Sequence, residues 1–190
     1  FSVQVNEVNS APMFQPRSNM TILAGRKLLL TNDVSDSDVP PQSVTFTLLS
    51  APEGLTLDSR TGILEWRPQI KAAGSTNLIV ISATDNGIPT LSATQSFKVI
   101  VLRPAPPALR VTHSSEGACA LEVSGDEGPD YIIERTLGLS PAQWEPVLIK
   151  LEPILPFVWT APASTNALLL STGCGSGHNT TGCAIDIGIR

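Results

Sequence analysis

The sequence has few charged residues, few aromatic residues and no long hydrophobic run, and each shortage excludes a class of protein. Only 15% of the 190 residues are charged, and the twelve Lys and Arg residues are scattered, so a phosphate-binding surface and a nucleic-acid partner are not expected. The longest apolar run, NLIVISA, is much shorter than the roughly 20 residues that span a bilayer, so membrane insertion is not expected either. No segment repeats apolar residues at the spacing of an amphipathic helix, which argues against a helical fold.

Motifs of common catalytic sites are also missing from the sequence. The two histidines, His113 and His178, lie neither in an HExxH motif nor beside an evident nucleophile. No P-loop and no glycine-rich dinucleotide fingerprint occurs. We therefore expect a protein that is not an enzyme.

What the sequence does contain is a series of short runs rich in Val, Ile, Leu and Thr, separated by sixteen prolines and fourteen glycines. This composition is typical of an all-β protein. Residues 43–48 and 96–101 show the pattern most clearly, because apolar and mostly polar side chains alternate along them. Each run is therefore predicted to be a strand with one face on a hydrophobic core.

The runs fall into two series, which predict two domains. About seven runs lie in residues 12–103 and about seven more in residues 108–190, the number expected of a small β-sandwich. The PAPP segment, residues 104–107, is predicted to be a stiff linker because proline fixes φ and lacks an N–H donor. Residues 1–11 are predicted to form a separate N-terminal strand and linker. The expected fold is all-β, with two tandem β-sandwiches of about seven strands each.

Several motifs in the first half resemble those of cadherin-like repeats, in the family's order over about residues 5–102. NEVNSAPMF resembles the linker and first strand, DxNDNxPxF, and VSDSDVPPQSVTFTL resembles the ATDxD segment with its strand. LDSRTGIL resembles the IDxxTGxI turn, and ISATDNGIPTLSATQSFKVIV resembles the closing AxDxGxPxLSxxxxxxVxV. The segment ILEWRP stands where true cadherins carry an acidic LDRE, and it is closer to the dystroglycan-type and "putative immunoglobulin" repeats of bacterial surface proteins.

The second half resembles the small carboxy-terminal sandwich of secreted bacterial proteins. In that family a GxxYxIExSxDL strand precedes W-x-P, and the corresponding stretch here is GPDYIIERTLGLSPAQWEP. NALLLSTG stands where the family often has a final FYR strand. Together the resemblances imply two immunoglobulin-like or cadherin-like sandwiches and an extracellular, secreted protein.

The resemblance to cadherin-like repeats also implies a calcium site. Calcium takes roughly six to eight oxygen ligands, so several segments must contribute to one site. A preceding repeat would have to supply about half of them, and the alternative is an acidic turn that caps strands and is the relic of a cation site. The expected cofactor is therefore calcium or none. The ligands carried over by position are Asn6, Glu7, Asn9, Asp36, Asp38 and Asp85.

The chain contains three cysteines. Cys174 and Cys183 flank GSGHNTTG, a loop long enough for two strand ends to meet, and they are predicted to form a disulfide. Cys119 shares a predicted strand face with Leu121 and Val123, which indicates a core residue. Three free thiols, or a bond between Cys119 and either of the others, remain alternatives.

Three tryptophans distinguish two possible functions. If Trp66, Trp144 and Trp159 were exposed and coplanar, they would form a sugar-stacking platform, and the chain would be a carbohydrate-binding accessory module of a secreted hydrolase. Each lies in a strand-like run, however, where a place in the core is more common. The expected function is therefore that of a non-enzymatic structural or adhesive module in a larger cell-surface or filament-forming protein.

The N-terminal segment FSVQV alternates Phe1, Val3 and Val5 with polar residues, which predicts a strand with one apolar face. Such a strand must fold back on its own molecule, belong to a preceding repeat, or add to a sheet edge of a neighbouring copy. Because the sequence starts without an initiator Met or signal-peptide pattern, we expect a mature or excised piece of a longer protein. The expected partners are neighbouring repeats or copies of the chain, a cell-surface protein or a glycan.

Overall fold

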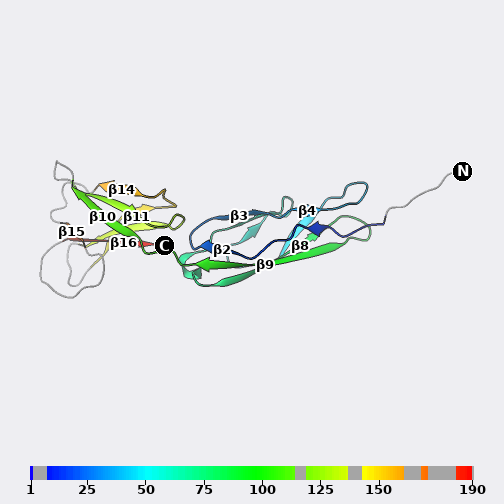
Figure 1. Cartoon of the computed structure of the whole chain (residues 1–190), viewed down its shortest axis with the longest axis horizontal. Coiled ribbons are helices and arrows are strands. Elements are labelled where there is room, and N and C mark those ends of the chain that lie inside the picture. The colour runs from blue at the N-terminus through cyan, green and yellow to red at the C-terminus, as the bar shows by residue number, and fades with distance from the viewer. Residues whose placement is uncertain (2–7, 114–118, 137–142, 161–167, 171–182, 190) are drawn as a thin grey trace. The chain divides into compact units, whose positions relative to one another are not determined.

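The computed structural model describes residues 1, 8–113, 119–136, 143–160, 168–170 and 183–189 (Figure 1). Within these residues every regular element is a β-strand except one 3-10 helix, η1 (Ile70–Ala72), so the predicted all-β fold is confirmed. No helix in this part of the chain is long and apolar enough to cross a membrane. The chain divides into two compact units: Phe1–Ile22, Lys27–Pro68 and Ala72–Leu102 form the first, and Leu23–Arg26, Gln69–Lys71 and Arg103–Arg190 form the second.

Residues 12–103, all of which the structure describes, contain nine strands rather than about seven. The two additional strands, Met13–Phe14 and Val34–Ser35, have only two residues each and are too short to show a period in the sequence. The strands are β1 (Met13–Phe14), β2 (Met20–Leu23), β3 (Leu28–Thr31), β4 (Val34–Ser35), β5 (Thr45–Ser50), β6 (Thr56–Leu57), β7 (Ile63–Trp66), β8 (Thr76–Thr84) and β9 (Ser92–Leu102).

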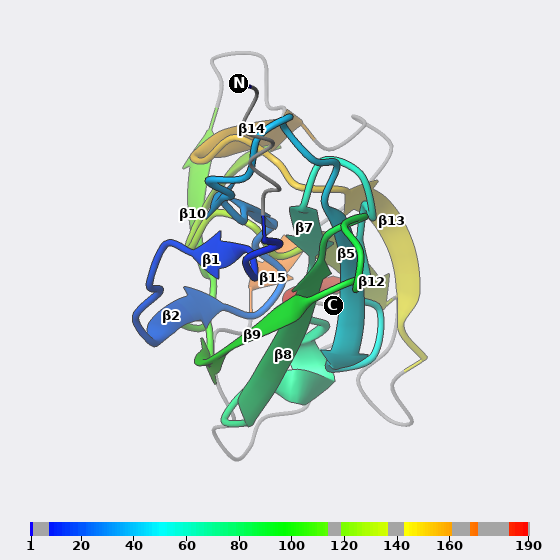
Figure 2. The same cartoon turned by 90° about the vertical axis from the view of Figure 1, so that its right-hand side faces the viewer.

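These strands form a four-stranded sheet in the order β2-β9-β8-β5, a three-stranded sheet in the order β3-β7-β6 and the small pair β1-β4. Figure 2 shows β8 between β9 and β5. The antiparallel ladder of β8 and β9 runs from Thr76 opposite Ile100 to Thr84 opposite Ser92. The β8–β9 loop that follows Thr84 therefore lies at one end of the longest ladder in the described first half.

The core of the first unit is built from alternate residues of its strands. In β8, Ile79 and Ile81 have no exposed surface, and in β9, Phe97 is only 2% exposed, whereas Leu78 on the opposite face is 48% exposed. Burying one such side chain stabilises the fold by roughly 1.5–3 kcal/mol. The three-stranded sheet contributes Leu64 and Trp66, the buried residues of β7.

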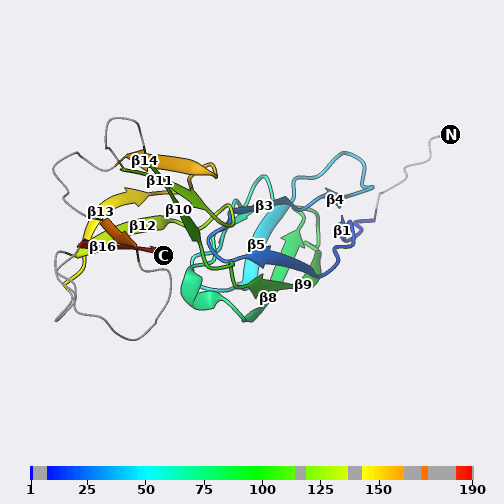
Figure 3. The same ribbon diagram turned by 60° about the vertical axis from the view of Figure 1, so that its left-hand side comes forward.

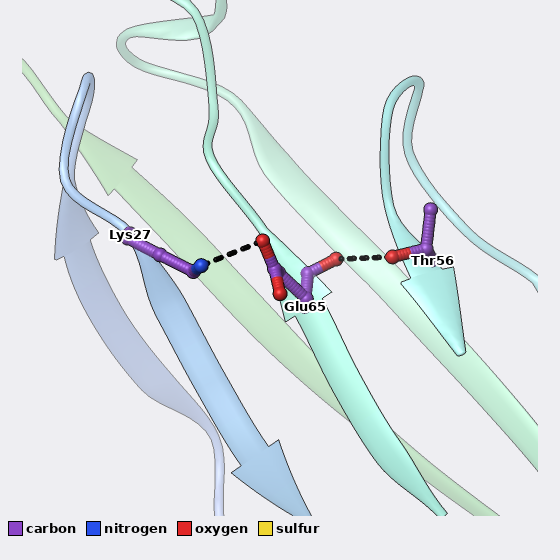
Figure 4. Close-up of polar contacts among 3 residues, drawn as sticks. All are labelled: Lys27, Thr56 and Glu65. Atoms are coloured by element: carbon purple, nitrogen blue, oxygen red, sulfur yellow. Dashed lines mark hydrogen bonds and ion pairs between the residues drawn. The ribbon is translucent and has the colours of Figure 1, made fainter. Parts of the chain in front are cut away.

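The outer face of the three-stranded sheet carries polar contacts instead. The Nζ of Lys27 lies 2.7 Å from Oε1 of Glu65, and the hydroxyl of Thr56 donates a hydrogen bond of 3.4 Å to the backbone carbonyl of Glu65 (Figure 4). Both charged side chains are about half exposed, so solvent screening leaves this ion pair worth little. In β7 the exposed Ile63 and Glu65 alternate with the buried Leu64 and Trp66, which is the period of a half-buried strand.

The second half contains seven strands in the part that the structure describes. Figure 3 shows β12 between β13 and β16 in a sheet of order β13-β12-β16-β15, and a second sheet has the order β10-β11-β14. All ladders are antiparallel except the parallel pair β15 and β16. The strands are β10 (Ala108–His113), β11 (Cys119–Ser124), β12 (Tyr131–Thr136), β13 (Glu145–Lys150), β14 (Phe157–Thr160), β15 (Leu168–Leu170) and β16 (Cys183–Ile189).

The second half has a hydrophobic core of its own. Leu121 and Val123 of β11 and Tyr131 and Ile133 of β12 are at most 1% exposed. The ring of Phe157 packs edge-on against Tyr131, with ring centroids 6.4 Å apart. The arrangement as two tandem sandwiches, with a linker at residues 104–107, stays a prediction.

Candidate functional site

Loops of the first unit bring most of the predicted calcium ligands to one place. Asn9 lies in the segment before β1, Asp36 and Asp38 lie in the β4–β5 loop, and Asp85 directly follows β8. Hydrogen bonds connect all four of these residues into one network. The other two predicted ligands, Asn6 and Glu7, lie outside the described residues.

Asp85 is only 4% exposed and holds the β8–β9 loop closed. Its Oδ1 accepts hydrogen bonds from the backbone N–H groups of Gly87, at 3.0 Å, and Leu91, at 2.9 Å. Its Oδ2 accepts a hydrogen bond of 3.1 Å from Nδ2 of Asn9. One buried carboxylate therefore closes a loop and also attaches the segment that precedes β1.

Asn9 lies directly against the β8–β9 loop. Its Nδ2 also donates to the carbonyl of Pro89 at 2.8 Å. A Cβ added to Gly87 would overlap the side-chain amide of Asn9, so only glycine permits this approach. Gly87 is therefore needed for the close packing of Asn9 as well as for the turn. The sequence motif alone does not indicate this packing role.

Asp38 is 7% exposed and fixes the same N-terminal segment from the β4–β5 loop. Its two carboxylate oxygens accept the backbone N–H of Ser10, at 3.2 and 3.0 Å. The backbone N–H of Asp38 in turn donates to Oδ1 of Asp36 at 3.1 Å, which is the local capping bond expected of an acidic turn. Asp38 therefore joins two segments that are far apart in the sequence. The hydrogen bond that Asp36 accepts lies within its own turn.

Gln42 joins the part of the network around Asp38 to the part around Asn9 and Asp85. No sequence motif points to Gln42. Its Nε2 donates to Oδ2 of Asp38 at 3.0 Å and also to Oδ1 of Asn9. The amide orientations are mutually consistent: because Nδ2 of Asn9 donates to Asp85 and to Pro89, its Oδ1 is left to accept from Gln42. The only sequence feature that links Gln42 to this network is that it lies four residues after Asp38.

The described residues do not fit a calcium ion. Within them no group of three or more His, Cys, Asp or Glu side chains is placed to hold a metal ion. The NH₂ group of Gln42, a donor, stands between the oxygens of Asn9 and Asp38, where a cation would need acceptors. In this network two buried oxygens accept no hydrogen bond, Oδ2 of Asp36 and Oε1 of Gln42, and they fall far short of the roughly six to eight that calcium takes. The complete ligand set stays a prediction because it includes Asn6 and Glu7.

The turn that resembles the family's TG motif has a structural role. Oδ1 of Asp58 accepts the backbone N–H groups of Arg60, at 3.0 Å, and Thr61, at 2.7 Å. These hydrogen bonds, that of Thr61 first, lower the pKa of Asp58 below its usual value. Gly62 follows with a φ of 67°, and a Cβ there would meet the ring of Phe46 at 2.8 Å. The motif therefore encodes a tight turn against the core.

The predicted disulfide cannot be followed in the structure. Cys174 lies outside the described residues, and Cys183 is described only as the first residue of β16. The side chain of Cys119, which begins β11, also lies outside the described part. The bond between Cys174 and Cys183 stays a prediction, and so does the core position of Cys119.

The tryptophans do not form one platform. Trp66 is 2% exposed, and its Nε1 donates to the carbonyl of Glu53 at 3.1 Å, so it belongs to the core of the first unit. Trp159 packs against the core of the second half, and Trp144 is 40% exposed. Trp66 therefore cannot take part in sugar stacking.

Residues 11–102 match the family model He_PIG, described as "Putative Ig domain". This match confirms the predicted immunoglobulin-like repeat, while the resemblance of the second half stays a prediction. No curated protein sequence matches the chain significantly.

Among solved structures, the chain is similar to the protocadherin GammaB4 extracellular domain, with 23% identity and a TM-score of 0.43 over 58% of this chain and 20% of that one. It is similar to mouse cadherin-23 EC22-24, with 23% identity and a TM-score of 0.42 over 53% and 33%. It is also similar to the third cadherin domain from human protocadherin 7, with 18% identity and a TM-score of 0.41 over 54% and 95%. The chain thus spans a third or less of the first two structures.

Proposed function

We propose that this chain, whose residues 11–102 form an immunoglobulin-like domain, is a non-enzymatic structural or adhesive segment of a larger extracellular protein. The observation that carries the proposal is the attachment of Asn9 and Ser10 to two separate loops, through Asp85 and Asp38. An attached segment of this kind restricts the directions in which a preceding repeat could join the domain. That restriction suits a spacer in which neighbouring repeats are joined stiffly.

The chemistry of the candidate site also supports a role that is not catalytic. Its buried carboxylates, Asp38 and Asp85, accept hydrogen bonds from backbone or amide N–H groups within the fold. Carboxylates held in this way cap loops and are poorly placed to exchange protons with a substrate. The proposed partners are therefore neighbouring repeats, copies of the chain, or a protein or glycan at a cell surface.

Addition of the N-terminal strand is the proposed route of assembly between copies. The FSVQV segment has the alternating pattern of a strand with one apolar face. In the four-stranded sheet of the first unit, β2 and β5 are the edge strands, and an edge strand offers backbone groups that can pair with a further strand. In β5 the backbone N–H of Phe46 already donates to the carbonyl of Ser59 at 2.8 Å, so β2 is the more open of the two edges in the described residues. A strand donated by one copy to the next would satisfy those groups and link copies head to tail.

The test compares the full chain with a variant that lacks residues 1–5, by light scattering and electron microscopy over a range of concentrations. Val3→Asp places a charge on the apolar face of the segment, and Gln4→Asp, the matched control, places it on the polar face. We expect the deletion and Val3→Asp to abolish assembly and Gln4→Asp to retain it. The same oligomeric state for all four proteins would contradict strand addition.

A further inference from the structure

The residues Asn9, Ser10, Asp38, Gln42 and Asp85 form a connected set of hydrogen bonds, here named the N-terminal clamp. We propose that the side-chain amide of Gln42 takes the structural place of a cation in the N-terminal clamp, so that the first unit holds its N-terminal segment without metal. This inference concerns the stability of one unit and does not depend on the proposed function of the chain.

The N-terminal clamp contains two buried carboxylates. Burial of a charged group destabilises the folded state unless other interactions replace its lost hydration. Asp38 and Asp85 are 7% and 4% exposed, and a buried carboxylate is tolerated only when hydrogen bonds or an opposite charge replace its water. In a calcium-binding domain the cation supplies that compensation. Here N–H donors supply it: the side chain of Asn9 and two backbone amides for Asp85, and Ser10 and Gln42 for Asp38.

Gln42 makes the cross-link that a cation would otherwise make. A primary amide carries two N–H donors on one nitrogen, and here that nitrogen donates to Oδ1 of Asn9 and to Oδ2 of Asp38. The two acceptors belong to different segments, and Asn9 is 33 residues away from Gln42 in the sequence. One positively polarised group therefore holds two oxygens together, as a bridging ion does.

A cation and this amide exclude each other. A cation between Asn9 and Asp38 would stand against the amide hydrogens of Gln42, which carry partial positive charge. To admit the ion, Gln42 would have to turn its Oε1 toward it and break both of its hydrogen bonds. The Oδ1 of Asn9 stays turned toward Gln42, because the Nδ2 of Asn9 is held by Asp85 and Pro89.

The test is thermal unfolding of the full chain in chelator and in about 10 mM calcium, which exceeds the roughly 0.1–1 mM dissociation constants of weak extracellular sites. We expect the wild type to melt at the same temperature in both. Gln42→Ala should lower the Tm of the first unit by roughly 5–15 °C in both, because it removes a hydrogen bond to a buried charge. Gln95→Ala is the matched control and should change the Tm little, because among the described residues the side-chain amide of Gln95 donates only to the exposed backbone carbonyl of Gln15.

A second variant separates the amide from side-chain size. Gln42→Glu keeps the shape of the side chain but replaces the donors with a carboxylate beside Asp38. We expect a lower Tm than the wild type in chelator, with a rise on addition of calcium. A wild-type Tm that rises with calcium would overturn the proposal, even if Gln42→Ala did not fold. A Gln42→Glu variant as stable as the wild type in chelator would overturn it too.

Discussion

At the scale of single residues, one buried polar group fixes a loop of the second unit. Tyr131 is 1% exposed, and its hydroxyl donates a hydrogen bond of 2.7 Å to the backbone carbonyl of Asp126. A Cβ at Gly125 would lie 2.5 Å from that hydroxyl oxygen, so the loop can approach the ring only with glycine there. Burial, and then the negative charge of Asp126, raise the pKa of Tyr131 above its usual value.

We expect Tyr131→Phe to destabilise the second unit by about 1 kcal/mol at neutral pH, the usual net value of one hydrogen bond. The pH dependence follows from the raised pKa. The folded state favours the protonated phenol, so the stabilising contribution of Tyr131 is fully present below its unfolded pKa of about 10 and is lost as the pH rises through the folded value. Urea unfolding of both proteins from pH 7 to pH 11 measures this difference.

Tyr131 is the only tyrosine in the chain, so the comparison isolates one phenol. Every other residue is common to both proteins, so its contribution cancels in the comparison. The advantage of the wild type over Tyr131→Phe should shrink at high pH. A difference that stays constant from pH 7 to pH 11 would contradict this account.

The sequence predicted part of the candidate site, for a physical reason. Asp36, Asp38 and Asp85 stand out because carboxylates in turns are conspicuous, and the family motifs place them near Asn9. Gln42 does not stand out, since a glutamine in a polar loop has many possible partners. The path of the loop decides which side chains lie near Gln42, and the sequence does not show that path.

At the scale of elements, the long strands were predictable and the short ones were not. Residues 96–101 alternate in the sequence, and in β9 the side chains of Phe97, Val99 and Val101 are indeed buried. A two-residue strand such as β1 or β4 has no period to detect, and its pairing depends on neighbouring loops. The parallel pairing of β15 with β16 also depends on the path of the chain between strands. Alternation of apolar and polar residues within a strand does not encode that path.

The two faces of β8 give a matched pair of substitutions. We expect Ile79→Ala to destabilise the first unit by about 2–5 kcal/mol, because Ile79 has no exposed surface and its removal leaves a cavity. Leu78→Ala, at the adjacent residue on the opposite face, should cost about 0.5 kcal/mol or less, because Leu78 is 48% exposed. Chemical denaturation followed by circular dichroism measures both, and equal effects would show that β8 does not have one buried face.

At the scale of the whole molecule, each unit has buried side chains of its own. Among the residues whose burial the structure describes, the core cluster of the second half and the side chains packed against it lie between Leu109 and Trp159. The last boundary between the units along the chain falls between Leu102 and Arg103, so the PAPP segment belongs to the second unit. There the backbone N–H of Ala105 donates to Oδ2 of Asp126 at 2.6 Å. The second unit thus holds the segment predicted to be a stiff linker by at least one hydrogen bond.

Separate cores predict separate unfolding. We expect calorimetry of the full chain to show two transitions, because cooperativity requires shared packing and multidomain chains commonly depart from two-state behaviour. Ile79→Ala should lower the temperature of one transition, and Tyr131→Phe should lower that of the other. In the double variant the two shifts should add without interaction, because the two residues belong to separate cores. Leu78→Ala serves as the control that moves neither transition appreciably. One transition shifted by both Ile79→Ala and Tyr131→Phe would contradict two independent units and show that the two halves fold as a single cooperative body.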